Sequence, residues 1–504
     1  MRPLLLLLAT VALALSAERL PNIVLIYADD LGYGDLSCYG ATAVATPHCD
    51  RAAAEGLRLT SGYCTSATCT PSRYSMLTGE YAWRRKGTGI LPGDARLIIA
   101  PGSATLPALL KRAGYATAVV GKWHLGLGAK DRPADWNGEV GPGPLDIGFD
   151  SCFLMPATGD RVPCVYLRDR RVVGLDPADP IAVSYQEPFP GVPTGVTARA
   201  TLKMDWDYGH NDAVVNGVGR IGHMTGGTAA LWKDEDMADV LAREGAAYIA
   251  RFKDRPFFLY YAAHSIHVPR VVHERFAGKS PMGPRGDAIL EFDFQVGALM
   301  DALKANGVAD DTLVIITSDN GAVINDGYKD QAVAKIGTHR ACGPLRGGKY
   351  SAFEGGCRVP FIVWGRGVEP GVSDALVSQV DFAAPFAALA GVTPAANELP
   401  DSVVQVDGLL GRDPIGRPWM IEHANGVALR VGAWKYIPPG KVRDDIVRGS
   451  SFTVPEPGML FDLAKDPGEQ SPVDDAAKLA ELTARLAALR ATAGTRPGFM
   501  AAAK

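Results

Sequence analysis

Short apolar runs, rich in β-branched or aromatic residues, recur along most of the chain. They are Asn22–Ala28, Ala116–Val120, Pro256–Tyr261, Thr312–Thr317 and Val359–Trp364. Such runs predict strands that are buried on both faces, as in a sheet covered by helices. Helical patterns lie between them, at Ser72–Leu77, Thr105–Arg112, Asp234–Ala250 and Ala288–Ala305. The alternation predicts an α/β fold with a large central, mainly parallel sheet flanked by helices, in which ligands bind beyond the carboxyl ends of the strands.

Two parts of the chain depart from this alternation. Residues 130–230 are rich in Gly, Pro and Asp without a clear period, which indicates long loops over the rim of the sheet. After about residue 395, short antiparallel strands are predicted at Gly426–Ile437 and Met459–Leu463, followed by an amphipathic helix at Ala476–Ala493. We therefore expect a main domain over 18–394 and a smaller C-terminal α+β subdomain over 395–504.

The first residues have the pattern of a targeting segment. Arg2 is followed by an apolar run over 4–15 and then by Ser16 and Ala17, which predicts a secretory signal peptide over 1–17. The run is too short to cross a bilayer comfortably, and no later stretch is long and apolar enough for a membrane span. The sequence therefore predicts a secreted or periplasmic protein.

Charge and cysteine content narrow the range of partners and cross-links. The formal net charge is −4, which gives no electrostatic reason to expect nucleic acid, although a local group of cations could still bind a small anion. Eight cysteines in 504 residues do not make a disulfide-packed scaffold. Cys152–Cys164 and Cys342–Cys357, which are close in sequence, are the pairs we would expect if disulfides form.

Acidic and amide side chains directly follow two of the predicted strands. The first strand ends in Asp29 and Asp30, and the strand over 312–317 is soon followed by Asp319 and Asn320. Adjacent carboxylates repel each other unless a cation lies between them, and parallel strands end at the same rim of a sheet. A solvated loop is the alternative for Asp29 and Asp30 alone. Together these oxygen ligands predict a site that suits Ca²⁺, with Mg²⁺ left open.

The most specific segment is Cys-Thr-Pro-Ser-Arg at 69–73, followed by Leu-Thr-Gly at 77–79. Pro71 suits the first turn of a helix, which places Cys69 at a helix N-terminus, where backbone N–H groups favour anions. Arg73 lies about one turn further along the same face and can hold an oxyanion beside Cys69. For this segment by itself, a buried thiol before a Pro-initiated helix is the alternative.

At this segment the chain resembles the type I (formylglycine-dependent) sulfatases, arylsulfatase-like members of the alkaline-phosphatase-like superfamily, whose signature is C-x-P-S-R. Further segments are similar to motifs of that family. They are G-Y-x-T-x-x-x-G-K-W-H-x-G at 114–126, a strand that delivers a histidine at 257–269, and R-G-G-K-x-x-x-x-E-G-G-x-R-x-P at 346–360. Leu-Phe-Asp-Leu at 460–463, with Asp-Pro-Gly-Glu at 466–469, resembles a segment common near sulfatase C-termini.

The resemblance implies hydrolysis of sulfate esters with one divalent metal and a formylglycine (3-oxoalanine), which a formylglycine-generating enzyme makes from Cys69. It implies a catalytic sulfatase domain over 18–394. The implied metal ligands are Asp29, Asp30, Asp319 and Asn320, together with the converted side chain of Cys69.

The resemblance also implies roles for the remaining catalytic residues. Arg73, Lys122 and Lys349 would neutralise charge on the sulfate. Asp319 would accept a proton from the attacking hydroxyl. His267 or Lys349 would assist the departing alcohol, and His124 would take the second proton. His267 is the histidine assigned to the pocket, with His264 as the alternative.

The expected substrate is a sulfated small molecule or glycan, and more narrowly a galactose or N-acetylgalactosamine sulfate within an oligosaccharide. The candidate substrate contacts are Thr158, His210, Asp212, His223, His339 and Arg340. Thr158 stands near the place where arylsulfatases carry a sulfate-binding serine. For most of the others, an exposed polar loop residue is the alternative.

Two other functions remain open on the sequence. A phosphodiesterase or phosphonate hydrolase of the same superfamily often binds two metals through further His and Asp ligands, whereas one oxygen-rich set is obvious here. A non-catalytic sulfoglycan-binding protein would not need Cys69. Turnover of phosphate against sulfate esters separates the first alternative, and the chemical state of Cys69 separates the second.

Overall fold

The computed structural model describes residues 19–447 and 450–501 of the chain. The predicted signal peptide over 1–17 lies outside these residues. Within the described ranges, no helix combines the length and the apolar character that a membrane crossing requires.

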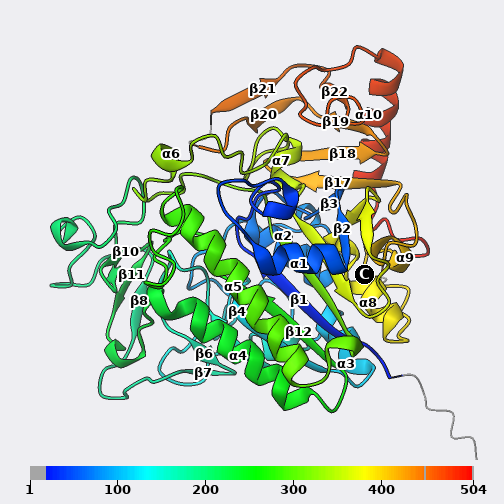
Figure 1. Cartoon of the computed structure of the whole chain (residues 1–504). Coiled ribbons are helices and arrows are strands. Elements are labelled where there is room, and N and C mark those ends of the chain that lie inside the picture. The colour runs from blue at the N-terminus through cyan, green and yellow to red at the C-terminus, as the bar shows by residue number, and fades with distance from the viewer. Residues whose placement is uncertain (1–18, 448–449, 502–504) are drawn as a thin grey trace, which may run out of the picture.

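A ten-stranded mixed sheet runs through the middle of the molecule (Figure 1). In spatial order its strands are β15 (Gly371–Ser373), β2 (Leu57–Leu59), β14 (Phe361–Gly365), β13 (Thr312–Ser318), β1 (Asn22–Ala28), β12 (Phe257–Ala262), β4 (Ala116–Lys122), β5 (Ser151–Met155), β6 (Leu167–Arg168) and β7 (Arg171–Val172). The central strands from β13 to β5 are all parallel. β14, β6 and β7 form antiparallel pairs. The predicted α/β fold with a large central sheet is confirmed, and its parallel part is the centre.

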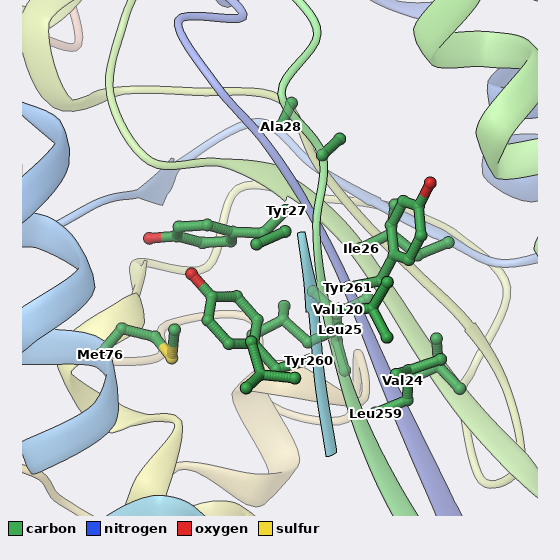
Figure 2. Packing of buried hydrophobic residues seen from close by; sticks show 14 of the residues in the cluster. Val24, Leu25, Ile26, Tyr27, Ala28, Met76, Val120, Leu259, Tyr260 and Tyr261 are labelled. Atoms are coloured by element: carbon green, nitrogen blue, oxygen red, sulfur yellow. The ribbon is translucent and has the colours of Figure 1, made fainter. Parts of the chain in front are cut away.

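Helices cover both faces of the sheet, which is why every residue of β1, β4, β12 and β13 is buried. One face carries α2 (Cys69–Thr78), α3 (Leu106–Arg112) and α8 (Ala383–Leu389), and the other carries α1 (Pro47–Glu55), α4 (Met237–Phe252) and α5 (Pro284–Ala305). Figure 2 shows Tyr27 and Tyr260 pointing toward Met76 of α2, while Tyr261 points to the opposite side. There the Tyr261 hydroxyl donates to Gln295 of α5 at 2.8 Å.

The region over 130–230 contributes β5, β6 and β7 to the central sheet, which the sequence did not predict, and its other described strands are short and lie outside that sheet. They include β8 (Ala182–Ser184), β9 (Val214–Val215), β10 (Val218–Gly219) and β11 (His223–Thr225). Other short elements are β3 (Gly62–Tyr63), β16 (Val377–Ser378), α6 (Ala332–Lys335), α7 (Glu354–Cys357) and α9 (Val406–Leu409).

The C-terminal part forms a separate antiparallel sheet with a helix beside it (Figure 1). Its strands are β17 (Trp419–His423), β18 (Val427–Val431), β19 (Trp434–Ile437) and β22 (Met459–Asp462), its hairpin is β20 (Gly440–Arg443) with β21 (Ser451–Val454), and its helix is α10 (Ala476–Ala491). The predicted strands over 426–437 and 459–463 and the terminal helix are confirmed. The division of the chain at residue 395 stays a prediction.

A buried group of charges joins this sheet to the main domain. Lys435 Nζ lies 3.0 Å from Glu354 Oε1, 3.0 Å from Glu422 Oε2 and 3.3 Å from Glu469 Oε1. All four side chains are at most 1% exposed. Glu469 also accepts a hydrogen bond from the backbone N–H of Glu354. We refer to these four residues as the lysine-centred cluster.

The expected disulfides are wrong, because all eight cysteines are free thiols. Cys152 Sγ donates to the Asp169 carbonyl at 3.3 Å, and Cys164 Sγ donates to the Arg161 carbonyl at 3.6 Å, so each thiol faces its own loop. Cys342 Sγ donates to the Gly355 carbonyl at 3.5 Å. Cys357 interacts with Cys64 rather than with Cys342.

Candidate active site

The carboxyl ends of β1 and β13 bring four oxygen-bearing side chains together. Asp29 and Asp30 follow β1, and Asp319 and Asn320 follow β13, its parallel neighbour. All four are completely buried, and carboxylate oxygens of the three aspartates lie within 4.8 Å of one another. Asn320 Nδ2 donates to Asp30 Oδ1 at 2.7 Å. The predicted metal ligands are therefore adjacent in space.

Two oxygens of this group lack hydrogen-bond partners in the described part of the chain. They are Asp29 Oδ1 and Asn320 Oδ1. Buried polar atoms in native proteins are normally satisfied, so these oxygens indicate a missing partner. A set of carboxylate and amide oxygens fits a hard divalent cation such as Ca²⁺ or Mg²⁺. The residues present therefore fit the metal that the sequence predicted.

Each aspartate of the trio also contacts its own cation. Lys122 Nζ donates to Asp29 Oδ2 at 2.5 Å, and Lys349 Nζ donates to Asp30 Oδ2 at 2.9 Å. Arg73 donates from Nε and Nη2 to Asp319 Oδ2, at 3.0 and 2.7 Å. Such a dense group of buried charges is costly to assemble without a function or a ligand to compensate it.

Electrostatics keep two of these cations charged. Burial disfavours the Lys349 ammonium, but Asp30 and Asp326 outweigh it and raise the pKa of Lys349 well above its usual value. Burial also disfavours the charged form of Arg73. The surrounding groups, Tyr260 and Asp319 foremost, nevertheless raise its pKa. Both side chains can therefore present positive charge to an anionic substrate.

Cys69 begins α2, as the position of Pro71 in the first turn predicted, although the helix starts three residues before the expected Ser72. Its side chain is 2% exposed. Burial raises the pKa of the Cys69 thiol, although Lys122 and Lys349 oppose the shift. A protonated thiol is a poor nucleophile, so this geometry does not favour attack by unmodified Cys69.

His124 lies against Cys69, with Nδ1 at 3.4 Å from Sγ. Its Nε2 donates to the Leu91 carbonyl at 2.9 Å, which leaves Nδ1 of the neutral ring as the acceptor on the side of Cys69. Burial, assisted by Lys122 and Arg161, lowers the pKa of His124 well below its usual value. A neutral His124 can accept a proton at Nδ1 from a group at position 69.

The loop after β12 brings both candidate histidines to the site. His267 Nδ1 donates to the Val268 carbonyl at 2.7 Å, and its Nε2 lies 3.7 Å from Asp30 Oδ2. Burial, followed by Lys349 and Lys122, lowers the pKa of His267. His264 lies close to Asp29 and His267, and both of its ring nitrogens lack described partners. The sequence-based preference for His267 is consistent with its contacts.

Asp326 is a residue of this site that sequence reasoning missed. Its Oδ2 accepts a hydrogen bond from Lys349 Nζ at 2.9 Å and lies 3.9 Å from His267 Nε2. Burial opposes ionisation, yet Lys349 holds the pKa of Asp326 below its usual value. The segment after Asn320 carries no family motif, and the proximity of Asp326 to the second strand end was the available signal.

The predicted substrate contacts Thr158 and His210 meet through a pair that sequence reasoning also missed. Arg161 Nη1 lies 2.8 Å from both carboxylate oxygens of Asp160 and 3.2 Å from Thr158 Oγ1. His210 Nε2 lies 2.9 Å from Asp160 Oδ2. Burial opposes ionisation, but Arg161 and His210 hold the pKa of Asp160 well below its usual value. Asp160, Arg161 and His210 form what we call the polar wall of the site.

The polar wall adjoins the reacting group. The Cys69 thiol is among the groups that act electrostatically on the Arg161 guanidinium, as is Tyr350, which follows Lys349. The Arg161 side chain is 15% exposed, so part of it is accessible to solvent.

The structure places the other predicted substrate contacts elsewhere. Asp212 and His223 face each other, with 3.9 Å between Oδ1 and Nε2, and Asp212 also accepts from the Gly222 N–H. His339 Nε2 lies 2.8 Å from Asp35 Oδ1 in a buried pair that Arg285 completes, which gives this ring a structural partner. Arg340 is exposed. The structure brings none of these four residues into contact with the catalytic group.

Comparison with known proteins agrees with this geometry. A family model described as "Sulfatase" matches residues 21–392. An N-acetylgalactosamine-6-O-sulfatase of Bacteroides thetaiotaomicron is 48% identical over 461 residues, which cover 90% of this chain and 89% of that protein. Human arylsulfatase A is 34% identical over 487 residues, which cover 92% and 85%.

A solved structure shows the same architecture. It comes from work on the metabolism of multiple glycosaminoglycans by Bacteroides thetaiotaomicron and superposes with a TM-score of 0.89. Its sequence is 46% identical, and the match covers 94% of this chain and 99% of the other.

Proposed function

Because this chain belongs to the sulfatase family and hydrolyses sulfate esters, we propose that it removes the 6-sulfate of N-acetylgalactosamine residues in glycans. The observation that carries the proposal is the polar wall beside Cys69, in a chain 48% identical to an N-acetylgalactosamine-6-O-sulfatase. Family membership decides among the functions that the sequence left open, in favour of sulfate esters over phosphonates and over binding without catalysis.

The polar wall supports a carbohydrate substrate rather than an aryl or steroid one. Asp160 offers carboxylate oxygens and Arg161 offers guanidinium N–H groups, while His210 directs Nε2 to Asp160 and Nδ1 to the Tyr208 carbonyl. Sugar hydroxyls can donate to the Asp160 carboxylate and accept from Arg161, whereas an apolar leaving group would cover these polar atoms without forming hydrogen bonds to them. Such a site favours a ring with hydroxyls, because a ring without them would remove water from these polar atoms and offer no hydrogen bond in return.

We assign the metal site to Asp29, Asp30, Asp319 and Asn320 and propose Ca²⁺ as its ion. When bound there, the cation would supply positive charge next to the sulfate and lower the pKa of a nearby hydroxyl. A formylglycine made from Cys69 would supply a hydrated aldehyde in place of a protonated thiol.

The other residues bind the sulfate and move protons. Lys122 and Lys349 hold positive charge where the sulfate oxygens must lie, and Arg73 fixes Asp319 in place through two hydrogen bonds. His124 accepts a proton at Nδ1 from the side chain at position 69. His267 donates from Nδ1 to the Val268 carbonyl and is neutral, so its Nε2, 3.9 Å from Asp326 Oδ2, can accept a hydrogen bond. The proton for the departing sugar oxygen would come from the Lys349 ammonium.

Maturation and location are part of the same proposal. A formylglycine-generating enzyme would act on the Cys-Thr-Pro-Ser-Arg segment at 69–73. The N-terminal pattern over 1–17 supports secretion or export to the periplasm. Sulfated glycans too large to enter a cell would then be accessible to the enzyme.

The proposal is tested first by mass and then by substrate. Conversion of Cys69 lowers the mass of the peptide that contains it by about 18 Da in protein from its native host. The converted protein should release sulfate from N-acetylgalactosamine 6-sulfate faster than from N-acetylglucosamine 6-sulfate or an aryl sulfate. The Cys69→Ala protein is the inactive control. Equal rates on all three sulfates would reject the assigned substrate, and preferential turnover of a phosphonate monoester would reject the reaction.

A substitution in the polar wall separates sugar recognition from chemistry. His210→Ala should lower kcat/KM for the sugar sulfate by about 10²-fold, since the buried Asp160 carboxylate loses the partner that positions it toward the sugar. Turnover of an aryl sulfate, which has no hydroxyl at that place, should change by less than about threefold. A similar loss on both substrates would mean that His210 only maintains the fold.

A further inference from the structure

The hairpin β20–β21 of the C-terminal part reaches over the rim of the central sheet (Figure 1). Its Arg443 carbonyl accepts a hydrogen bond from Ser351 Oγ at 2.6 Å, and the Ile446 carbonyl accepts from the Ile324 N–H at 2.8 Å. Asp444 accepts from Arg346 Nε at 2.6 Å. The hairpin is thus fixed to the two loops that carry Lys349 and Asp326.

Tyr350, next to the catalytic Lys349, holds the Arg443 side chain. The Arg443 guanidinium carbon lies 4.8 Å from the centre of the Tyr350 ring, within the range of a cation–π contact. The backbone of Tyr350 has φ 73°, a left-handed conformation that is uncommon for a bulky residue. Strained conformations of this kind persist where the surrounding structure needs a particular side-chain direction. Here that direction places the ring beneath Arg443.

Arg443 differs from the other cations of the site in having no carboxylate partner among residues 19–447 and 450–501. Lys122, Lys349 and Arg161 are each paired with an aspartate at 2.5–2.9 Å. Arg443 is half-buried. A guanidinium that is held in place and left without a counter-charge is suited to bind an anionic ligand.

Lys349 approaches the same ring as Arg443, with its Nζ 5.3 Å from the centre of the Tyr350 ring. Tyr208, which is 45% exposed, donates to the Asn325 carbonyl next to Asp326. Burial raises the pKa of Tyr208 and Asp326 adds to the shift, whereas Arg443 and Lys349 both oppose it. The charges of Arg443 and Lys349 therefore both act on the Tyr208 hydroxyl.

We propose that Arg443, held by Tyr350, forms an outer anion subsite that binds a carboxylate or sulfate on the sugar adjoining the one whose ester is cleaved. The inference rests on the proposed function and adds a second charged contact to it. The C-terminal part would then contribute directly to the choice of glycan, in addition to supporting the fold. Because Arg443 contacts neither the metal ligands nor Cys69, the subsite should act on substrate affinity rather than on the chemical step.

The test compares three substrates with one shared reacting sugar. They are N-acetylgalactosamine 6-sulfate alone, the same sugar linked to a uronic acid, and the same sugar linked to a neutral hexose. Arg443→Ala should raise KM about fivefold for the uronic acid compound and leave kcat unchanged, as for a partly exposed ion pair. The other two substrates should change by less than about twofold.

Two further variants control for charge and for structure. Lys441→Ala removes an exposed cation from the same strand and should leave all three substrates unaffected. Arg443→Lys keeps the charge but loses the planar fork, so it should retain part of the preference. Raising the ionic strength should weaken the preference of the wild-type enzyme for the uronic acid compound and have no such effect on Arg443→Ala.

The outcomes separate this inference from the proposed function. Equal losses on all three substrates, or no loss on any, would overturn the outer subsite while leaving sulfate release from the monosaccharide as support for the proposed function. If the wild-type enzyme released sulfate from none of them, the proposed function would fail. The subsite would then be judged by calorimetry with the Cys69→Ala protein, where binding of the uronic acid compound must weaken about fivefold on Arg443→Ala.

Discussion

The active site and the lysine-centred cluster are both buried groups of carboxylates and cations, yet they are organised in opposite ways. In the lysine-centred cluster, one ammonium lies among three carboxylates, at 3.0, 3.0 and 3.3 Å. In the active site, each of Asp29, Asp30 and Asp319 contacts a cation of its own on one side. The first group has a cation at its centre, and the second has its cations around the edge.

This difference distinguishes a site that can bind a metal ion from a buried cluster of charges that has a structural role. Burial raises the pKa of Glu422 to about 8 and of Glu469 to about 7, although Lys435 opposes both shifts, so protons can neutralise the excess carboxylates. Glu422 also has an oxygen without a described partner. An unpaired buried oxygen therefore does not identify a metal site by itself. Whether a cationic side chain lies among the carboxylates is the more informative feature.

The largest expected effect is on catalysis, from removing one active-site carboxylate. Asp319→Asn deletes a proposed metal ligand and the partner of Arg73, so kcat/KM should fall by about 10²–10³-fold or more. Sulfate release would be measured on protein whose circular dichroism matches the wild type. A decrease of less than about tenfold would contradict the assigned role of Asp319.

The matching change in the lysine-centred cluster should affect stability instead. Lys435→Met leaves three buried carboxylates without their shared cation and should lower the free energy of unfolding by about 3–5 kcal/mol at pH 8. The loss should be smaller at pH 5.5, because protons can then neutralise Glu422 and Glu469. Urea unfolding at the two pH values measures this difference. A loss that is independent of pH would show that the cluster does not take up protons.

Calcium should stabilise the protein through the active site alone. At a concentration about 100 times Kd, a ligand that binds only the folded state adds about 2.7 kcal/mol. Thermal unfolding with calcium and with EDTA should show this stabilisation in the wild type and in Glu422→Gln. Asp29→Asn should lose most of it. An equal calcium effect in Asp29→Asn would place the ion elsewhere.

The smallest expected effect is the pH dependence that Glu422 contributes. Its folded-state pKa, about 8, lies above the ordinary value of 4.5, so the folded protein binds the proton more tightly than the unfolded chain. The resulting stabilisation is complete below about pH 4.5 and is lost as the pH rises toward 8. Glu422→Gln mimics the protonated form and should remove at least about 1.4 kcal/mol of the decrease, the equivalent of one pKa unit.

An exposed carboxylate provides the control for this titration. Glu481 is paired with Lys478 on the surface of α10, and Glu481→Gln should leave the pH dependence of unfolding unchanged. The two variants would be unfolded in urea across pH 5–8. If Glu422→Gln kept the wild-type slope, the shifted pKa would have to belong to another group.

The metal ligands and the motif residues could be predicted because strand ends and helix N-termini fix their positions locally. Asp29 and Asp319 follow neighbouring parallel strands, and Pro71 defines the turn that begins α2 at Cys69. These placements depend on short-range geometry that the sequence pattern states directly.

The remaining functional residues could not be predicted because long loops position them. Asp160 meets His210 across 50 residues, and Arg443 reaches Tyr350 from a different sheet. Asp326 accepts a hydrogen bond from Lys349, although no sequence pattern connects the two segments that carry them. The predicted role of His339 stays a prediction, and the structure adds that its ring is paired with Asp35, which Arg285 also binds.

The hydrogen bond between Glu354 and Glu469 also bears on the order in which parts of the chain are synthesised and can pack together. It joins residues 115 positions apart and supports the segment that begins just after Lys349. At about 5–20 residues per second, a ribosome needs about 6–23 s to make the chain between them. When that interval begins, Cys69 and Lys349 have both been synthesised, whereas β19, the β20–β21 hairpin and β22 are made only toward its end. The residues of the catalytic centre are therefore synthesised early, and the hairpin that covers their loops is added late. Until the hairpin is made, the C-terminal part does not cover the centre.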